Sequence, residues 1–143
     1  MNIVETAKEL ATRAHAGQVD KAGRPYIEHV ARVAAAVSDD PEAEAVAWLH
    51  DVLEDCDDAF RVEILDRFSE RVYRACCRLD RNRSYDNVEY YAVIRSNPLA
   101  LRVKLADIAD NADESRLALL DDKTAARLRR KYAKARKALG VTP

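Results

Sequence analysis

A histidine and several carboxylates follow an apolar run in the stretch AVAWLHDVLEDCD, residues 45–57. His50 and Asp51 come first, and Glu54 and Asp55 lie one helical turn further on. At about 100° per residue, the four side chains span roughly a 140° arc of one helix, beside the side that faces the core. A buried carboxylate must be paired or bind a cation, and a histidine nitrogen beside a carboxylate oxygen is a natural half of a metal site. Taken alone, the stretch favours a helix end with ordinary hydrogen bonds.

Two other stretches supply groups of the same kind. RPYIEHV places His29 on a helix directly after a Gly/Pro loop, and RVKLADIADN places Asp107 and Asn111 one turn apart with Lys104 nearby. Each of these also has an ordinary interpretation, as a packed histidine or as a surface acid of an amphipathic helix. Together, two His and two Asp from three helices form a mixed nitrogen and oxygen donor set. Such a set suits Mn²⁺ or Fe²⁺ better than a closed thiolate zinc site does.

The elements that must position these groups are helices. Apolar residues recur with helical spacing along most of the chain, and no alternating strand pattern interrupts them. We therefore expect an all-α fold, a compact bundle of about seven to nine helices. The expected helical stretches are 2–16, 25–37, 41–57, 60–68, 69–79, 85–95, 98–111 and 121–139.

Polar residues before these stretches predict where several helices begin. Asp39 or Asp40 can cap the helix that starts at Pro41, Ser84 can cap the helix over 85–95, and Asn97 can cap the helix that starts at Pro98. The segment GQVDKAGRP, residues 17–25, contains two Gly and a Pro and is expected to be a loop.

Composition limits the class of protein. The 143 residues suit a single domain over 1–143, and a hydrophobic content of 48% is too high for disorder. The net charge of −1 gives no strong bias toward nucleic acid or membranes, and no apolar run is long enough to span a bilayer. Three cysteines, of which Cys76 and Cys77 are adjacent, fit a reducing cytoplasm better than a disulfide framework.

The expected helix over 121–139 has a basic face. Its apolar residues lie at helical spacing, and its other face carries Lys123, Arg127, Arg129, Arg130, Lys131, Lys134, Arg136 and Lys137. The face can be the solvated side of a docking helix, or it can attract phosphates or a partner. Because no aromatic residues interleave with the charges, nucleic-acid binding is not expected. A homo-oligomer is left open.

Three motifs, AHAGQVDKAGRPYIEHV, LHDVLED and VKLADIADN, resemble the HD-domain metal-dependent phosphohydrolases in their order and spacing. Over roughly residues 5–120 the chain is most similar to the RelA/SpoT-type hydrolase domain and the small alarmone hydrolases. The resemblance implies one metal ion, usually Mn²⁺, held by His29, His50, Asp51 and Asp107. It also implies a nucleotide substrate, with removal of pyrophosphate from the 3′ position of ppGpp or pppGpp.

The resemblance further implies roles around the metal. Glu54 and Asp55 match an acidic pair implicated in handling the attacking water, and Asn111 matches an Asn that lines the nucleotide site. Lys21 and Tyr26 match residues of the loop beside the substrate. Lys104 is also expected to bind substrate. Elementary chemistry agrees, because a divalent cation activates water and a neighbouring carboxylate can accept its proton.

One position departs from the resemblance. Asp20 stands where the alarmone hydrolases have an Arg that contacts guanine, and a carboxylate cannot stack as a guanidinium does. ppGpp stays the expected substrate, and Asp20 is the reason to keep two alternatives to it, another nucleotide or a phosphomonoester. A non-catalytic metal- or nucleotide-binding module is a third hypothesis, against which the intact ligand set argues. No synthetase region is expected, so the chain is expected only to hydrolyse an alarmone.

Overall fold

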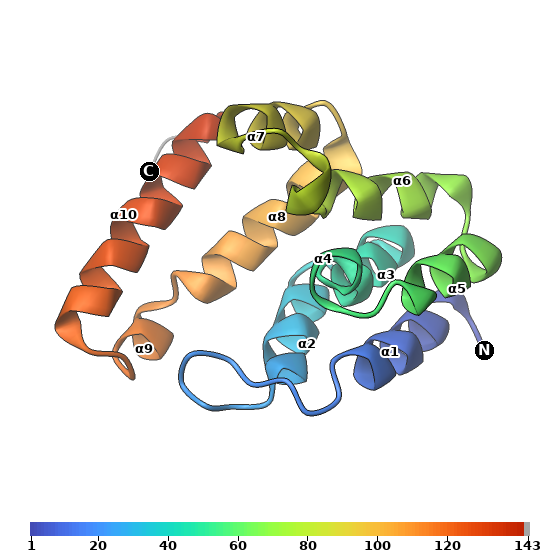
Figure 1. The fold of residues 1–143 in the computed structure, drawn as a ribbon, viewed down its shortest axis with the longest axis horizontal. Coiled ribbons are helices and arrows are strands. Elements are labelled where there is room, and N and C mark those ends of the chain that lie inside the picture. Colours follow the sequence, from blue (N-terminus) through green and yellow to red (C-terminus); the bar gives the residue numbers. More distant parts are fainter. Residues whose placement is uncertain (142–143) are drawn as a thin grey trace.

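The computed structural model describes residues 1–141, which form helices joined by loops and contain no strand (Figure 1). The elements are α1 (Ile3–Ala14), α2 (Tyr26–Ala36), α3 (Pro41–Leu49), α4 (Val52–Asp55), α5 (Ala59–Arg67), α6 (Glu70–Leu79), the 3₁₀ turn η1 (Arg81–Arg83), α7 (Asn87–Arg95), α8 (Pro98–Asn111), α9 (Glu114–Leu117) and α10 (Asp122–Ala138). Eight helices have nine or more residues, in agreement with the expected seven to nine, and α4 and α9 are additional single turns. The all-α expectation is confirmed. The last two residues of the expected domain, 142 and 143, lie outside the described residues.

Side-chain caps fix most of the helix starts. The Asp40 side chain accepts a hydrogen bond from the Glu42 amide at 3.0 Å, and the Asn97 side chain accepts one from the Ala100 amide at 2.9 Å. Both caps were expected. The expected cap at Ser84 is wrong, because Ser84 ends the 3₁₀ turn and α7 starts at Asn87. Asp86 caps α7 instead, since its carboxylate can reach the third amide of that helix.

The expected single helix over 41–57 is also wrong, because it breaks between α3 and α4. The Ala47 carbonyl accepts a hydrogen bond from the His50 amide at 3.4 Å and another from His50 Nδ1 at 2.6 Å. In a continuous α-helix this carbonyl would accept from the amide of Asp51. Asp51 instead has φ −104° and ψ −3°, so the chain turns at His50 and Asp51. The break presents both side chains at a bend rather than on a straight helix face.

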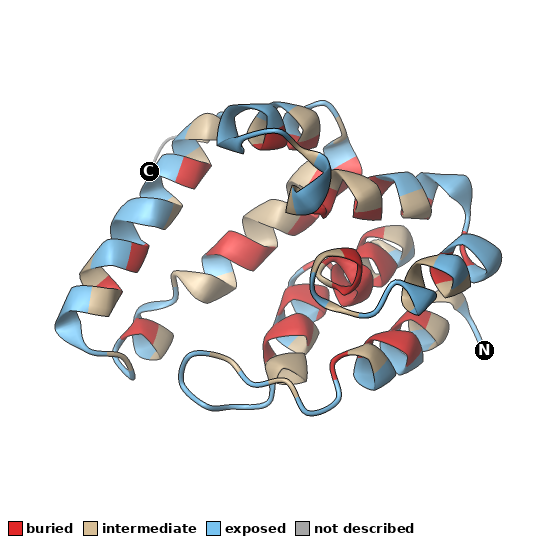
Figure 2. Cartoon of the chain, viewed as in Figure 1, coloured by how far each residue is buried: buried red, intermediate tan, exposed pale blue. Residues whose placement is uncertain are grey.

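The core surrounds α3, which is buried along most of its length. It contacts α1, α2, α6 and α8, and α8 in turn contacts α2, α7 and α10. Figure 2 shows buried residues gathered on α2, α3 and α8, whereas α10 is mostly exposed. The three segments that carry the expected metal ligands are therefore held by the main core.

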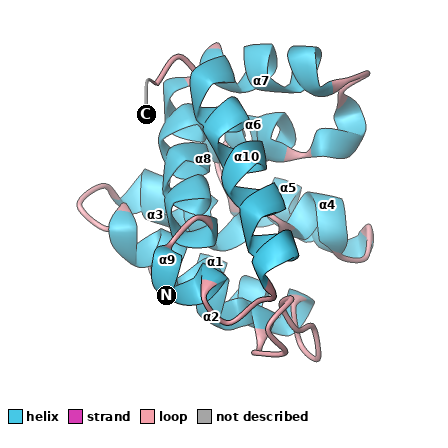
Figure 3. Cartoon of the chain, turned by 90° about the vertical axis from the view of Figure 1, so that its left-hand side faces the viewer, coloured by secondary structure: helices cyan, strands magenta, loops and turns pink. Residues whose placement is uncertain are grey.

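α10 packs on the bundle through a narrow apolar edge. Its main contacts with the bundle are with α7 and α8, and Figure 3 shows it alongside α8 on the near side of the molecule. Leu117 of α9 packs with Ala125 and Leu128 of α10 in a small cluster separate from the main core. The apolar residues that recur at helical spacing over 121–139 all pack inward, with Tyr132 against both clusters. They are Ala125, Leu128, Tyr132, Ala135 and Leu139. Within residues 1–141, no helix combines the length and the apolar character that crossing a bilayer requires.

Candidate metal centre and adjoining cavities

His29, His50, Asp51 and Asp107 meet between α2, the α3–α4 bend and α8. One donor atom from each lies within 4.8 Å of the corresponding atoms of the other three. Asp107 Oδ1 lies 2.9 Å from His29 Nε2 and 3.3 Å from His50 Nε2, and Asp51 Oδ2 lies 3.1 Å from His50 Nε2. Ligands on opposite sides of one ion at about 2.2 Å each would be about 4.4 Å apart, so the donors can share an ion.

The other ring nitrogen of each histidine, Nδ1, is hydrogen-bonded to a protein group. His29 Nδ1 donates to Asp110 Oδ2 at 2.6 Å, and His50 Nδ1 donates to the Ala47 carbonyl at 2.6 Å. Since both partners can only accept, Nδ1 carries the proton and Nε2 is the atom available to a metal. The donor set, two imidazoles and two carboxylates with nearly complete burial of the histidines, therefore fits a divalent cation.

The four groups also stabilise one another through their charges. Burial disfavours the charged imidazoles, but hydrogen bonds to Asp107 and Asp110 raise the pKa of His29. The charge of Asp51 and a hydrogen bond to Asp107 likewise raise the pKa of His50 above its ordinary value. Burial opposes ionisation of Asp107 as well, yet Lys104 and the two histidines lower the pKa of that carboxyl. The ligand set is thus a buried cluster that favours opposite charges on its imidazoles and carboxylates.

Three of the expected substrate-binding residues contact the ligand carboxylates. Lys104 Nζ lies 3.0 Å from Asp107 Oδ2, and Asn111 Nδ2 donates to Asp107 Oδ1 at 3.1 Å. The Tyr26 hydroxyl donates to Asp51. These side chains hold the carboxylates in place and also line the cavity in front of them.

Glu54 and Asp55 form an acidic pair next to Asp51. A carboxylate oxygen of each of the three lies within 4.8 Å of the others. Partial burial, followed by the negative charges of Asp51 and Glu54, raises the pKa of Asp55 to about 6. Burial also raises the pKa of Glu54, although its Oε1 accepts a hydrogen bond from the Arg81 amide at 2.8 Å. Carboxylates with raised pKa values are suited to accept a proton near neutral pH.

Two cavities adjoin these groups. The metal pocket, about 190 Å³, is lined by Asp51, Glu54, Asp55, Asp107 and several neighbours. A side cavity of about 300 Å³ is lined by Lys21 together with several leucines of 117–128. Tyr26, Asn111, Lys131 and Tyr132 line both cavities. Lys21 therefore lines the side cavity and does not line the metal pocket.

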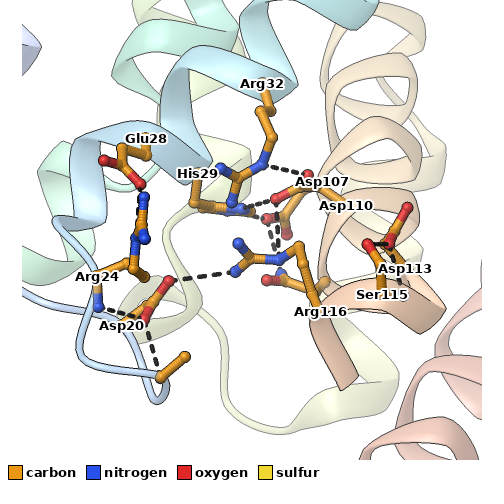
Figure 4. Close-up of polar contacts among 12 residues, drawn as sticks. Asp20, Arg24, Glu28, His29, Arg32, Asp107, Asp110, Asp113, Ser115 and Arg116 are labelled. Atoms are coloured by element: carbon orange, nitrogen blue, oxygen red, sulfur yellow. Dashed lines mark hydrogen bonds and ion pairs between the residues drawn. The ribbon is translucent and has the colours of Figure 1, made fainter. Parts of the chain in front are cut away.

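Asp20 is part of the frame of the side cavity. Its Oδ1 accepts hydrogen bonds from the Ala22 amide at 2.9 Å and the Arg24 amide at 3.0 Å, which closes the loop after residue 19. Its Oδ2 lies 3.5 Å from the Arg116 guanidinium, which reaches 3.6 Å from Asp110 on its other side. Figure 4 shows Arg116 between Asp20 and the Asp107–Asp110 pair, with His29 and Arg32 approaching from α2. A guanidinium thus faces Asp20 from α9.

The sequence did not single out several residues that surround the site. Asp110 lies three residues after Asp107, and this spacing on one helix face was a signal that could have identified it. Arg81, Arg116 and Tyr132 come from segments with no motif, and only folding brings them to the cavities.

Comparison with known proteins gives four findings. A family model described as HD domain matches residues 7–130. A guanosine-3′,5′-bis(diphosphate) 3′-pyrophosphohydrolase of Aquifex aeolicus is 42% identical over 72 residues, 48% of this chain and 10% of that protein. A protein of the same name from Vibrio cholerae serotype O1 is 49% identical over 51 residues, 34% of this chain and 7% of that protein. The matches thus span a tenth or less of the length of these curated relatives.

The fourth finding concerns a solved structure. A metazoan ortholog of SpoT, which hydrolyses ppGpp and plays a role in starvation responses, matches with a TM-score of 0.74 and 24% identity. The match covers 97% of this chain and 84% of that one, and it shows that the two share a fold.

Proposed function

Because the chain belongs to the HD domain family, we propose that it is a metal-dependent phosphohydrolase that releases pyrophosphate from the 3′ position of ppGpp. The observation that carries this proposal is the convergence of His29, His50, Asp51 and Asp107 on one point beside an acidic pair. The two curated relatives bear the name of this activity. Three free cysteines support a cytoplasmic setting.

We propose a single Mn²⁺ as the resident ion. Its four ligands are the two imidazoles, through Nε2, and the carboxylates of Asp51 and Asp107. When bound, the ion supplies positive charge that activates water and polarises a phosphoryl oxygen. Asp110 and the Ala47 carbonyl hold the two rings at Nδ1, which orients Nε2 of each ring toward the carboxylates of Asp51 and Asp107.

The residues around the ion activate the water and bind the substrate. Asp55, with Glu54 beside it, orients the attacking water and accepts its proton. The oxygen of this water adds to the 3′ phosphorus, and the bond from phosphorus to the ribose 3′ oxygen breaks. The departing 3′ oxygen takes up the proton that the acidic pair accepted, so the products are pyrophosphate and a nucleotide with a free 3′ hydroxyl. Lys104 and Asn111 offer positive charge and an amide to phosphate or ribose oxygens in the metal pocket. Lys21 and Tyr26 contact the substrate from the side cavity.

A second candidate substrate class, another nucleotide, is favoured by one observation. The position that Asp20 occupies is closed by its ion pair with Arg116 and by two loop hydrogen bonds. A guanidinium therefore still lines the side cavity, but it comes from α9 and is already engaged by carboxylates. The two candidate substrates, ppGpp and another nucleotide, differ in the base that the side cavity would bind.

The test is a product-resolved hydrolysis screen of a nucleotide panel with added Mn²⁺. We expect release of pyrophosphate from ppGpp and loss of this release in Asp51→Ala. Activity on a different nucleotide alone would overturn the substrate and leave the class intact. No turnover of any nucleotide by protein that has bound Mn²⁺ would overturn the enzyme proposal in favour of a binding module.

A further inference from the structure

A groove rich in cationic side chains lies between α10 and the α7 end of the bundle. It measures about 500 Å³ and is lined by Arg81, Arg127, Arg130, Lys131 and Lys134, with Asn87 and Tyr91 among the other lining residues. We call this groove the basic groove, and the five cationic residues are its members. No carboxylate belongs to its lining. Such a surface is suited to an anion with several charges.

The charges of the basic groove are not neutralised by the protein. Among residues 1–141, none of its five members forms an ion pair with a carboxylate. By contrast, Arg129 of the same helix pairs with Glu114 at 2.7 Å. Partial burial, together with the positive charges of Lys21, Arg81 and Lys104, lowers the pKa of the Lys131 ammonium. Bringing these cations together without a counter-charge is unfavourable, and a bound polyanion would reverse that.

One member of the groove is fixed by neutral partners. The Arg81 guanidinium donates to Asn87 Oδ1 and lies 4.3 Å from the centre of the Tyr90 ring. Both contacts hold the side chain in place without cancelling its charge. An arginine held in this way is preorganised for a phosphate, since its planar donor group matches two phosphate oxygens.

The basic groove is continuous with the metal pocket. Arg81, Tyr91, Lys131 and Ala135 line both. An anion in the groove is therefore next to whatever the metal pocket holds, which distinguishes this surface from the solvated face of an ordinary helix. The side cavity shares Lys131 with the groove and the metal pocket, but its other links to that pocket are Tyr26, Asn111 and Tyr132, which do not line the groove.

We propose that the basic groove binds a second phosphate chain of the substrate, the one that is not at the metal. This inference rests on the proposed function. It assigns the substrate class as a nucleotide that carries phosphate chains at two positions. The chain at the metal is cleaved, and the chain in the groove contributes binding energy and orientation.

The test compares two substrates and two double variants in the Mn²⁺-loaded protein. Arg130→Ala/Lys134→Ala removes two exposed groove cations one helical turn apart on α10, at a distance from the ligand set. Lys123→Ala/Lys137→Ala makes the same charge change on exposed α10 residues outside the groove lining and serves as the control. We expect the groove variant to lose about 10- to 100-fold in kcat/KM on ppGpp. On guanosine 3′-diphosphate, which lacks the second chain, it should lose less than about threefold.

Two kinetic outcomes would overturn the proposal. If the groove variant lost kcat/KM equally on both substrates, the groove would bind the departing pyrophosphate instead of the second chain. If the groove variant and the control variant lost kcat/KM equally on ppGpp, the loss would reflect the overall charge of α10 and not binding in the groove. Circular dichroism of both variants checks that α10 stays helical, as expected for alanine at exposed helix positions.

A binding measurement separates this proposal from the proposed function. Calorimetry with inorganic tripolyphosphate on metal-free protein should show binding that Arg130→Ala/Lys134→Ala weakens and the control variant does not. That result would support the groove even if ppGpp were not hydrolysed. Absence of tripolyphosphate binding by the wild type, or tighter binding of single-stranded RNA through the same residues, would overturn it.

Discussion

Each histidine of the metal centre is held by both of its ring nitrogens. His29 lies between Asp107 and Asp110, which are three residues apart on α8, and His50 lies between Asp107 and the Ala47 carbonyl. Asp110 is itself fixed by Arg32 at 2.7 Å. The orientation of a metal ligand on α2 is thus set by a carboxylate on α8 that does not belong to the ligand set.

Removing that carboxylate should weaken metal binding. We expect Asp110→Ala to bind Mn²⁺ about 10- to 100-fold more weakly, because the Nδ1–H of His29 loses its acceptor. Asp110→Asn, which keeps one acceptor oxygen, should retain more of the affinity. Calorimetric titration of Mn²⁺ measures both, with Asp66→Asn as a control at an exposed carboxylate on α5. An unchanged dissociation constant in Asp110→Ala would contradict the role given to Asp110.

For individual residues, the sequence predicted the metal-ligating side chains better than the residues that contact and orient the site. Ligating side chains have chemistry that can be recognised one residue at a time, and the four expected donors do lie together in the structure. The Asp20–Arg116 pair joins residues 96 positions apart, and no local pattern indicates it. Partners of this kind are set by how α9 folds back onto the loop at residues 17–25.

Among the helices, α8 contributes the most side chains to the site and its surroundings. It holds Asp107, Asp110 and Asn111 on one end, and its other end begins at the Asn97 cap and Pro98. Regular periodicity and a capping residue followed by proline made this helix predictable from the sequence. The break between α3 and α4 was not predictable in the same way, because it depends on the His50 side chain taking the Ala47 carbonyl.

Loss of the α8 cap should affect stability without affecting the metal. Asn97→Ala leaves the Ala100 amide without its acceptor and should lower the free energy of unfolding by about 1 kcal/mol. Asn97→Asp, which can accept the same hydrogen bond, should restore most of the loss. Urea unfolding measures the change. The Mn²⁺ dissociation constant should stay constant, since Asp107 lies ten residues along the helix, and a parallel loss of affinity would show that the cap also governs the site.

Across the whole molecule, the ligand set joins parts of the chain that are far apart in sequence. His29 belongs to α2, His50 and Asp51 to the α3–α4 bend, and Asp107 to α8, so an ion that binds all four ties three segments of the core together. The same side chains also contact one another directly, through ion pairs whose carboxylates are buried or nearly so. Binding to the folded state alone must then stabilise that state, because the unfolded chain does not assemble the site.

Metal removal and return should therefore be visible in thermal unfolding. At a free Mn²⁺ concentration 100 times the dissociation constant, the gain is about 2.7 kcal/mol, which corresponds to roughly 5–10 °C in Tm for a chain of this size. Chelator should reverse the shift. Asp51→Ala should shift far less with Mn²⁺, whatever its own Tm, and Asp66→Ala should shift as the wild type does. If Mn²⁺ left the wild-type Tm unchanged, or moved Asp51→Ala equally, the ion would be bound outside the four proposed ligands.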